Sequence, residues 1–288
     1  MSGSSSYPRP FENFGTAKLH QLTWEAEGVL RVSFKRGPVN SWVEPMWREL
    51  DAIFRHVATD TDVFAVVLSG EGRCFTAGLD LGSDSLGQVM EDAGPDVARR
   101  AFAMKRWVGE FQAAVSQMER CGKPVIAAVH NVAYGLGIDL LCAVDIRLAE
   151  STARFSVKEV DAGLAADIGT LQRLPKIVGN QSLVRELCFT AREFSAKEAL
   201  DMGFLSQLVD GGRDAVLKAA IDMAKVVASK APVALRGTKE LLLHARDHTV
   251  QQGLDFTALW SASMLQSEDI PVAMAAVMQK QTPKFAKL

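Results

Sequence analysis

The sequence has little cysteine, no excess of charge of one sign and no long apolar run. Its four cysteines are scattered, with no C-x-x-C pair and no histidine at metal-ligand spacing, so a reducing compartment is expected and a metal site is not. The formal net charge of −2 provides no basic field for nucleic acid or an anionic membrane. No apolar segment is long enough to span a bilayer. We therefore expect no metal, no nucleic-acid partner and no membrane association.

What the sequence does contain is typical of one large α/β domain. Its 288 residues are 48% hydrophobic and 23% charged, which is enough to form a sizeable buried core. Residues 1–20 begin with a serine-rich stretch that has no apolar core, so we expect a flexible arm and not a secretory signal. We expect the core at residues 21–212, and an almost wholly helical region suited to oligomerisation at residues 213–288.

The expected core alternates between strand and helix patterns. Residues 22–36 have a period near two and predict a strand pair, and residues 63–68 (VFAVVL) predict a strand covered on both faces. Between them, Trp47, Leu50, Phe54 and Val57 form one apolar stripe on a predicted helix. A helix near residues 101–120 and a strand at VIAAVH follow. This order of elements is typical of an α/β fold.

The first stretch that could carry chemistry is SGEGRCFTAGLD, directly after the VFAVVL strand. Gly78 permits a backbone path that turns the amide of Leu79 toward a ligand instead of into a sheet. An ordinary strand-to-helix turn with Asp80 as a helix cap explains the same residues. On its own, this stretch does not decide between the two.

The second stretch, NVAYGLGIDLL, places a glycine-spaced turn at the start of a predicted helix. Free amides near Leu136 and Gly137 would then point outward at the positive end of the helix dipole. Such a helix start attracts an anion or a developing oxyanion. It is no dinucleotide fingerprint, because the G-x-G-x-x-G spacing fails.

The third stretch, FSVKEVDAGLAADIGTLQRLP, contains carboxyl groups in an apolar, glycine-bearing setting. Asp167 lies between Ala166 and Ile168, where burial would raise its pKa and suit it to proton transfer. A structural ion pair with Arg173 or Lys158 explains this aspartate equally well.

Taken together, these stretches and TAREFSAKEALDMGFLSQLV resemble the enoyl-CoA hydratase/isomerase, or crotonase, family from about residue 22 to residue 209. The segment KEVDAGLAADIGTLQRLPK is most similar to the Δ3,5-Δ2,4-dienoyl-CoA isomerase branch, which has an acidic residue where ordinary hydratases have glycine. The resemblance implies a crotonase-like α/β spiral of repeated ββα units with a C-terminal helical oligomerisation region.

For the site, the resemblance implies that the backbone amides of Leu79 and Leu136 form an oxyanion hole for a thioester carbonyl. The residues implied to bind substrate around them are Ala77, Gly78, Asp80, Gly135 and Gly137. Leu136 stands where the family commonly has glycine, which leaves the amide donor in place and puts the acyl chain-length preference in doubt.

The resemblance also implies three catalytic carboxyl groups. Glu159 matches the carboxylate shared with hydratases, Asp139 the site of their second glutamate, and Asp167 the aspartate of the isomerase branch. In the expected reaction, ionised Glu159 takes a proton from C2 of a 3,5-dienoyl-CoA and protonated Asp167 delivers one at C6, with Asp139 supporting the pair. The sequence is compatible with the reverse assignment.

Two other functions stay open at this stage. A 2-enoyl-CoA hydratase would use Asp139 and Glu159 to activate water, although Asp139 is one methylene shorter than the usual glutamate. A non-catalytic protein of the same fold could bind an acyl-CoA or an RNA, but the three acidic positions and the absence of a basic patch argue against it.

The expected partner is an acyl-CoA thioester in fatty-acid β-oxidation, with no separate cofactor because CoA is part of the substrate. The resemblance implies a homotrimer or homohexamer. Ala286-Lys287-Leu288 is similar to the S-K-L peroxisomal address and predicts an import receptor as a further partner. We therefore expect a peroxisome or a related organelle such as a glycosome, with cytoplasm or mitochondrion as alternatives.

Overall fold

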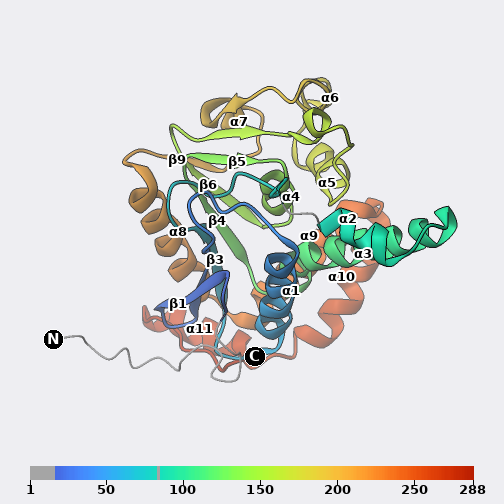
Figure 1. Cartoon of the computed structure of the whole chain (residues 1–288). Coiled ribbons are helices and arrows are strands. Elements are labelled where there is room, and N and C mark those ends of the chain that lie inside the picture. The colour runs from blue at the N-terminus through green and yellow to red at the C-terminus, as the bar shows by residue number, and fades with distance from the viewer. Residues whose placement is uncertain (1–16, 83–84) are drawn as a thin grey trace.

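A six-stranded sheet forms the centre of the computed structural model, which describes residues 17–82 and 85–288 (Figure 1). The strand order is β1-β2-β3-β4-β6-β9; β1 and β2 pair antiparallel and all other neighbours pair parallel. The strand bounds are His20–Ala26 (β1), Val29–Phe34 (β2), Ala65–Gly70 (β3), Val125–Val129 (β4), Ile146–Glu150 (β6) and Gln207–Val209 (β9). The expected strand pair and the VIAAVH strand are therefore confirmed, and the strand expected at residues 63–68 (VFAVVL) is present but runs from Ala65 to Gly70.

The alternation of side chains along each strand divides the core in two. In β3, Val66 and Leu68 face one apolar cluster, whereas Ala65 and Val67 face another. The first cluster is covered by α1 (Glu44–Thr59), α3 (Val97–Arg120) and α4 (Leu136–Cys142). The stripe expected from Trp47 to Val57 is the buried face of α1. These helices cover one face of the sheet. The helix described next covers the other face, so the sheet is buried on both sides, as the continuous apolar strands predicted.

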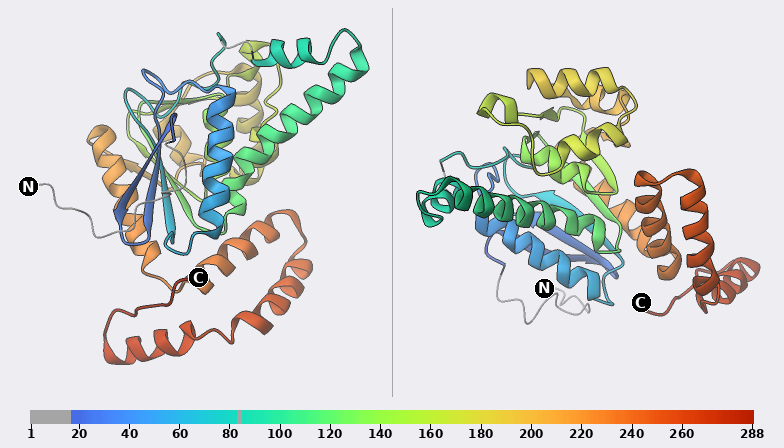
Figure 2. Two further views of the ribbon diagram at one scale, coloured as in Figure 1. Left: turned by 60° about the horizontal axis from the view of Figure 1, so that its bottom comes forward. Right: turned by 90° about the vertical axis from the view of Figure 1, so that its right-hand side faces the viewer.

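The second cluster is closed by α8 (Gly212–Ala228), which lies on β3, β4 and β6. Val216, Ala220 and Ala224 recur every four residues and form the face that contacts the sheet. The helices of the region expected from residue 213 thus pack in different places. Its first helix, α8, covers the sheet. Helix α9 (Pro232–Asp247) is tied to the segments beside β4 and β6 by the buried Lys239, which bonds to Lys123 and Asp145. Helices α10 (Val250–Met264) and α11 (Asp269–Gln279) lie apart from the sheet (Figure 2).

A smaller sheet brings the site segments together. It consists of β5 (Val132–Tyr134), β7 (Arg154–Ser156) and β8 (Phe194–Ser195) in the order β5-β7-β8. Helix α4 follows directly after β5, and the short helix η1 (Glu159–Ala162) follows β7. Because β5 and β7 are parallel, the two segments after them start from the same edge.

The remaining elements are helices around this smaller sheet and at the end of α3. Their bounds are Ser85–Asp92 (α2), Thr170–Ile177 (α5), Gln181–Thr190 (α6) and Ala196–Asp201 (α7). Within residues 17–82 and 85–288, no helix is both long and apolar enough to cross a membrane.

Candidate active site

A pocket of about 360 Å³ lies where the loop after β3, the start of α4 and η1 meet. Short bridges hold the loop in place: Thr76 pairs with Ala133 of β5, and Leu79 pairs with Trp42. The pocket is lined by Ala77, Gly78, Leu79, Leu81, Tyr134, Gly135, Leu136, Lys158, Glu159, Asp161, Ala162 and Leu164. Three of the stretches singled out in the sequence therefore contribute to one pocket.

The amide of Leu79 is directed away from its neighbouring strand. The amide of Trp42 donates to the Gly78 carbonyl over 2.8 Å, and the amide of Asp80 donates to the Trp42 carbonyl over 2.9 Å. In a parallel bridge, the residue between two such bonds turns its own N–H to the opposite side. The Leu79 amide is thus available to a bound molecule.

The amide of Leu136 is the first of α4, where N–H groups have no partner within the helix. Gly135 precedes it with φ +50° and ψ −116°, a conformation that disfavours a β-carbon. A β-carbon built on Gly78 would stand 3.8 Å from the Leu136 nitrogen, so the two turns are in contact. Leu136 is only 2% exposed, and its side chain packs in the first core cluster. It also lines the pocket, so we infer that its backbone faces the pocket.

Gly78 is required by space as well as by backbone angle. Its φ is +94°, and an added β-carbon would stand 2.8 Å from the Tyr134 carbonyl oxygen. Gly78→Ala should therefore lower the free energy of unfolding by about 1–3 kcal/mol, measured by urea denaturation. Gly203→Ala is the matched control, because Gly203 has φ +84° with no atom within 4 Å of the added carbon. An equal loss in both variants would mean that the Tyr134 contact contributes nothing.

Glu159, at the start of η1, places a carboxyl group in the pocket. Its Oε1 lies 3.5 Å from the position of a β-carbon on Gly135. Its Oε2 is buried and has no hydrogen-bond partner among the described residues. Burial, and secondly the nearby charge of Asp167, raise the pKa of Glu159. A buried carboxylate oxygen without a protein partner is suited to accept a proton from a bound molecule.

Asp139 lies behind the pocket, in α4, and is 1% exposed. Its Oδ1 accepts hydrogen bonds from the Thr170 amide (2.6 Å) and the Thr170 hydroxyl (2.7 Å). Burial, and secondly the charge of Glu159, raise the pKa of Asp139 to about 7. Asp139 is therefore placed to act on Glu159 electrostatically, and it does not line the pocket.

Asp167 is an exposed residue of the loop before α5, between the buried Ala166 and Ile168, and it does not line the pocket. The side-chain amide of Gln112 in α3 donates to its backbone carbonyl over 2.6 Å, and partial burial of the side chain raises the pKa of Asp167. The alternative ion pairs are not formed: Arg173 pairs with Glu119 at 2.7 Å and Lys158 with Asp161 at 3.0 Å. Both cations suggested for Asp167 thus have other carboxylates.

The other expected site residues divide into two groups. Ala77, Gly78 and Gly135 line the pocket with the two amides. Asp80 does not: its Oδ2 accepts a 2.6 Å hydrogen bond from Arg36, and its Oδ1 accepts the amide of Gly82. Gly137 does not line it either. An added β-carbon there would meet Thr76 Cγ2 at 2.9 Å, so α4 packs closely against the loop after β3 at this position. These two residues shape the turns around the pocket.

Several residues around the site were not expected from the sequence. Thr170 holds Asp139, Gln112 holds the loop of Asp167, and Tyr134 lines the pocket while its hydroxyl donates to Glu193 over 2.6 Å. None of them stands out by spacing or composition. In the part of the chain that the structure describes, no group of three or more histidine, cysteine or acidic side chains could hold a metal ion.

Comparisons with known proteins identify the family of this chain. Residues 25–287 match the family model described as Enoyl-CoA hydratase/isomerase. The chain is 45% identical over 272 residues to the mitochondrial Delta(3,5)-Delta(2,4)-dienoyl-CoA isomerase of Mus musculus, covering 93% of this chain and 83% of the relative. It is 44% identical over 227 residues to the peroxisomal enzyme of that name from Arabidopsis thaliana, covering 79% and 81%.

A solved structure shares the fold across almost the whole chain. The enoyl-CoA hydratase from Bacillus anthracis superposes with a TM-score of 0.83 at 25% sequence identity, covering 93% of this chain and 99% of that one. The crotonase-like architecture expected from the sequence is therefore confirmed.

Proposed function

The chain belongs to the enoyl-CoA hydratase/isomerase family, and on that premise we propose that it is a Δ3,5-Δ2,4-dienoyl-CoA isomerase of fatty-acid β-oxidation. One observation carries this choice: relatives 43–45% identical over 93% of the chain bear that name, whereas relatives named as enoyl-CoA hydratases are 29–30% identical. The pocket supports it, because the Glu159 carboxyl group, whose pKa is raised, lies beside two available amides, and the charge of Asp167 acts on Glu159.

The proposed reaction moves one proton across a conjugated system. The amides of Leu79 and Leu136 hold the thioester oxygen, so that loss of a C2 proton yields a stabilised dienolate. Ionised Glu159 accepts that proton, and protonated Asp167 donates one to C6, so the double bonds move from positions 3 and 5 to positions 2 and 4. The substrate gains and loses one proton, which leaves Glu159 protonated and Asp167 ionised. Proton exchange with water restores both groups before the next turnover, and no cofactor apart from the CoA of the substrate is needed.

Opposite protonation states of the two carboxyl groups follow from their setting. Two negative charges close together in a partly buried site repel, so one group retains its proton near neutral pH. Asp139 has a pKa of about 7 and adds a third acidic group behind Glu159. We assign Asp139 a supporting role, because its Oδ1 is engaged by Thr170 and it does not line the pocket.

Hydration of a 2-enoyl-CoA is the alternative function, since solved relatives of this fold are named as hydratases. It would require two carboxylates around one water in the pocket. Glu159 is so placed, but Asp139 is enclosed in α4. Asp139 therefore cannot supply the second carboxylate that such a water requires.

The test is a spectrophotometric assay of the purified protein with a 3,5-dienoyl-CoA, which follows absorbance of the conjugated 2,4-dienoyl product. We expect fast isomerisation, and hydration of a 2-enoyl-CoA at least 100-fold slower in kcat/KM. Fast hydration without isomerisation would replace the proposal with the hydratase. Failure of both reactions would leave a non-catalytic acyl-CoA-binding protein.

We propose further that the chain forms a homotrimer or homohexamer through its C-terminal helices. Many of the exposed large apolar side chains belong to this region, and exposed apolar surface is typical of protein interfaces. Those exposed most are Leu242, Val250, Leu254, Leu259, Leu265, Met274, Val277 and Met278.

We propose a peroxisome or a related organelle as the location. The support is the tripeptide Ala286-Lys287-Leu288, which is similar to a peroxisomal address. An import receptor that reads this tripeptide is the corresponding partner. The name of the Arabidopsis thaliana relative includes "peroxisomal", whereas that of the Mus musculus relative includes "mitochondrial".

A further inference from the structure

The last residues of the chain lie back on the folded body. The ammonium group of Lys287 forms an ion pair with Asp62, in the turn between α1 and β3. The hydrogen bond with Asp62 raises the pKa of Lys287, and the charges of Glu27 and Asp60 raise it further. Three carboxylates from segments far from the C-terminus thus face one tail lysine.

Leu288 lines a small hollow on the same side together with residues of the folded body, and this hollow is here called the tail-docking pocket. Its apolar walls are Phe64, Pro124, Pro232 and Leu235. Leu288 is 38% exposed, so the greater part of this residue is removed from water. Burial of an apolar side chain favours the docked position of the tail.

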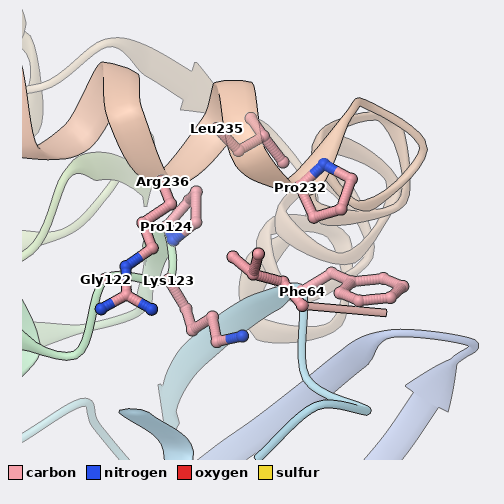
Figure 3. Close-up of a pocket in the computed structure, with 8 residues that line it drawn as sticks. Phe64, Gly122, Lys123, Pro124, Pro232, Leu235 and Arg236 are labelled. Atoms are coloured by element: carbon pink, nitrogen blue, oxygen red, sulfur yellow. The ribbon is translucent and has the colours of Figure 1, made fainter. Parts of the chain in front are cut away.

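Two cationic side chains also line the tail-docking pocket. Lys123 and Arg236 line it, and their nitrogen atoms lie on the same side of it (Figure 3). Lys123 is only 6% exposed. Burial, and secondly the charge of Arg236, lower the pKa of Lys123, so a negative charge beside the pair would be favourable. A pocket with apolar walls and two cationic lining residues suits an apolar residue that carries or adjoins a carboxylate.

The segment just before the tripeptide follows the same surface. Pro283, Lys284 and Phe285 line a second, adjoining hollow, and Phe64 and Pro232 line both. Residues 283–288 therefore run across one continuous surface. The tail-docking pocket and the catalytic pocket have no lining residue in common, so the proposed chemistry does not explain this surface.

We propose that the tail-docking pocket is a binding site for the chain's own C-terminal segment, a peptide of basic and apolar residues, and that docking there competes with an import receptor for the same residues. The competition rests on the peroxisomal address proposed above; the docking does not. Lys287 and Leu288 cannot contact the body and a receptor at the same time. The receptor therefore binds only the fraction of molecules whose tail is released, which weakens its apparent affinity by that fraction.

The contacts indicate a weak, reversible association. Exposed ion pairs contribute little, because both charges remain hydrated. Lys287 and Asp62 retain side-chain exposures of 60% and 31%. Docked and released tails should therefore exchange, with the docked form favoured by about two- to fivefold through the ion pair.

Asp62→Lys tests the docking without changing the tail. It places a positive charge opposite Lys287, and the hydrogen bond from the Asp62 amide to Asp60 involves only the backbone of residue 62 and is retained. The matched control is Asp201→Lys, which breaks the ion pair of Asp201 with Lys197 on α7. The readout is the initial rate at which a carboxypeptidase releases leucine from the native full-length protein. We expect a two- to fivefold faster release from Asp62→Lys, and the wild-type rate from Asp201→Lys.

A synthetic peptide of residues 279–288 provides the fully released reference. If wild type, Asp62→Lys and this peptide lost leucine at one rate, the tail would not be docked and the proposal would be overturned. The second readout is the affinity of the peptide-binding domain of a peroxisomal import receptor. We expect it to bind wild type more weakly than Asp62→Lys, by the same factor.

The outcomes separate docking from the address. Equal receptor affinity for the two proteins, with faster leucine release from Asp62→Lys, would overturn the competition and retain the docking. A receptor domain that did not bind the free peptide would overturn the proposed address, while leucine release would still decide the docking. Circular dichroism of each variant establishes that the native fold is present.

Discussion

Glu159→Gln should lower kcat for isomerisation of a 3,5-dienoyl-CoA by about 10²- to 10⁴-fold, the usual contribution of a positioned general acid or base. The amide side chain has nearly the same size but cannot accept the C2 proton. Asp167→Asn should lower kcat by a similar factor, because it cannot supply the proton at C6. KM should change much less in both variants, since the amides of Leu79 and Leu136 are untouched.

Asp161→Asn is the matched control for this pair. Asp161 lines the same pocket, but it is exposed and its carboxylate pairs with Lys158. The same chemical substitution there should change kcat by less than about threefold, since exposed ion pairs contribute little. A large loss in Asp161→Asn, or near wild-type activity in Glu159→Gln or Asp167→Asn, would contradict the proposed roles.

Exchange with heavy water assigns the two proton transfers separately. If Glu159 serves C2, Asp167→Asn should still incorporate deuterium at C2 of the substrate, whereas Glu159→Gln should not. The opposite pattern would assign C2 to Asp167 and C6 to Glu159. Mass spectrometry of recovered substrate measures the incorporation, and it does not depend on completion of the isomerisation.

The sequence predicted the layers of the fold because they depend on local periodicity. The apolar stripe of α1 and the continuous apolar run of β3 are set by side chains close together in sequence. The packing of α8 was not predictable in the same way. Val216, Ala220 and Ala224 indicate a helix with an apolar face, but not whether that face covers the sheet or another subunit.

The sequence predicted the parts of the pocket that are formed by single turns of the chain. It did not predict the contacts between segments that are distant in sequence. Gly78 and Gly135 adopt positive φ values, which glycine-bearing turns after strands make probable. By contrast, the bonds from Thr170 to Asp139 and from Arg36 to Asp80 connect residues 31 and 44 positions apart. No spacing rule relates residues so far apart. The sequence therefore could not show that Asp80 pairs with Arg36 instead of lining the pocket.

Asp139→Asn should make the protein more stable at pH 8 by about 2–4 kcal/mol, while leaving the free energy of unfolding at pH 4 almost unchanged. The pKa of Asp139 is about 7 in the folded protein and 3.8 ordinarily. The folded state therefore holds this proton more tightly than the unfolded state, so the stability of the wild type falls as pH rises from about 4 to about 7. Each unit of this difference corresponds to about 1.4 kcal/mol, which sets an upper bound near 4 kcal/mol.

Asparagine removes the charge and keeps an oxygen for the two hydrogen bonds from Thr170, so the contribution of residue 139 to this fall disappears. The stability of Asp139→Asn should still decrease somewhat as the pH rises, because the pKa values of Glu159 and Asp167 are also raised.

Urea denaturation at pH values from 4 to 8 measures the effect, and Thr170→Val is the control. It removes the hydroxyl bond to Asp139 but retains the carboxyl group, so its stability should still fall between pH 4 and pH 7. Identical pH profiles of stability for wild type and Asp139→Asn would mean that the pKa of Asp139 is not raised in the folded protein.

Because Asp139 is assigned a supporting role, kcat of Asp139→Asn should fall less than that of Glu159→Gln. A neutral side chain at position 139 would make the protein more stable at pH 8. The acidic group there is therefore explained by its contribution to the reaction, at a cost in stability.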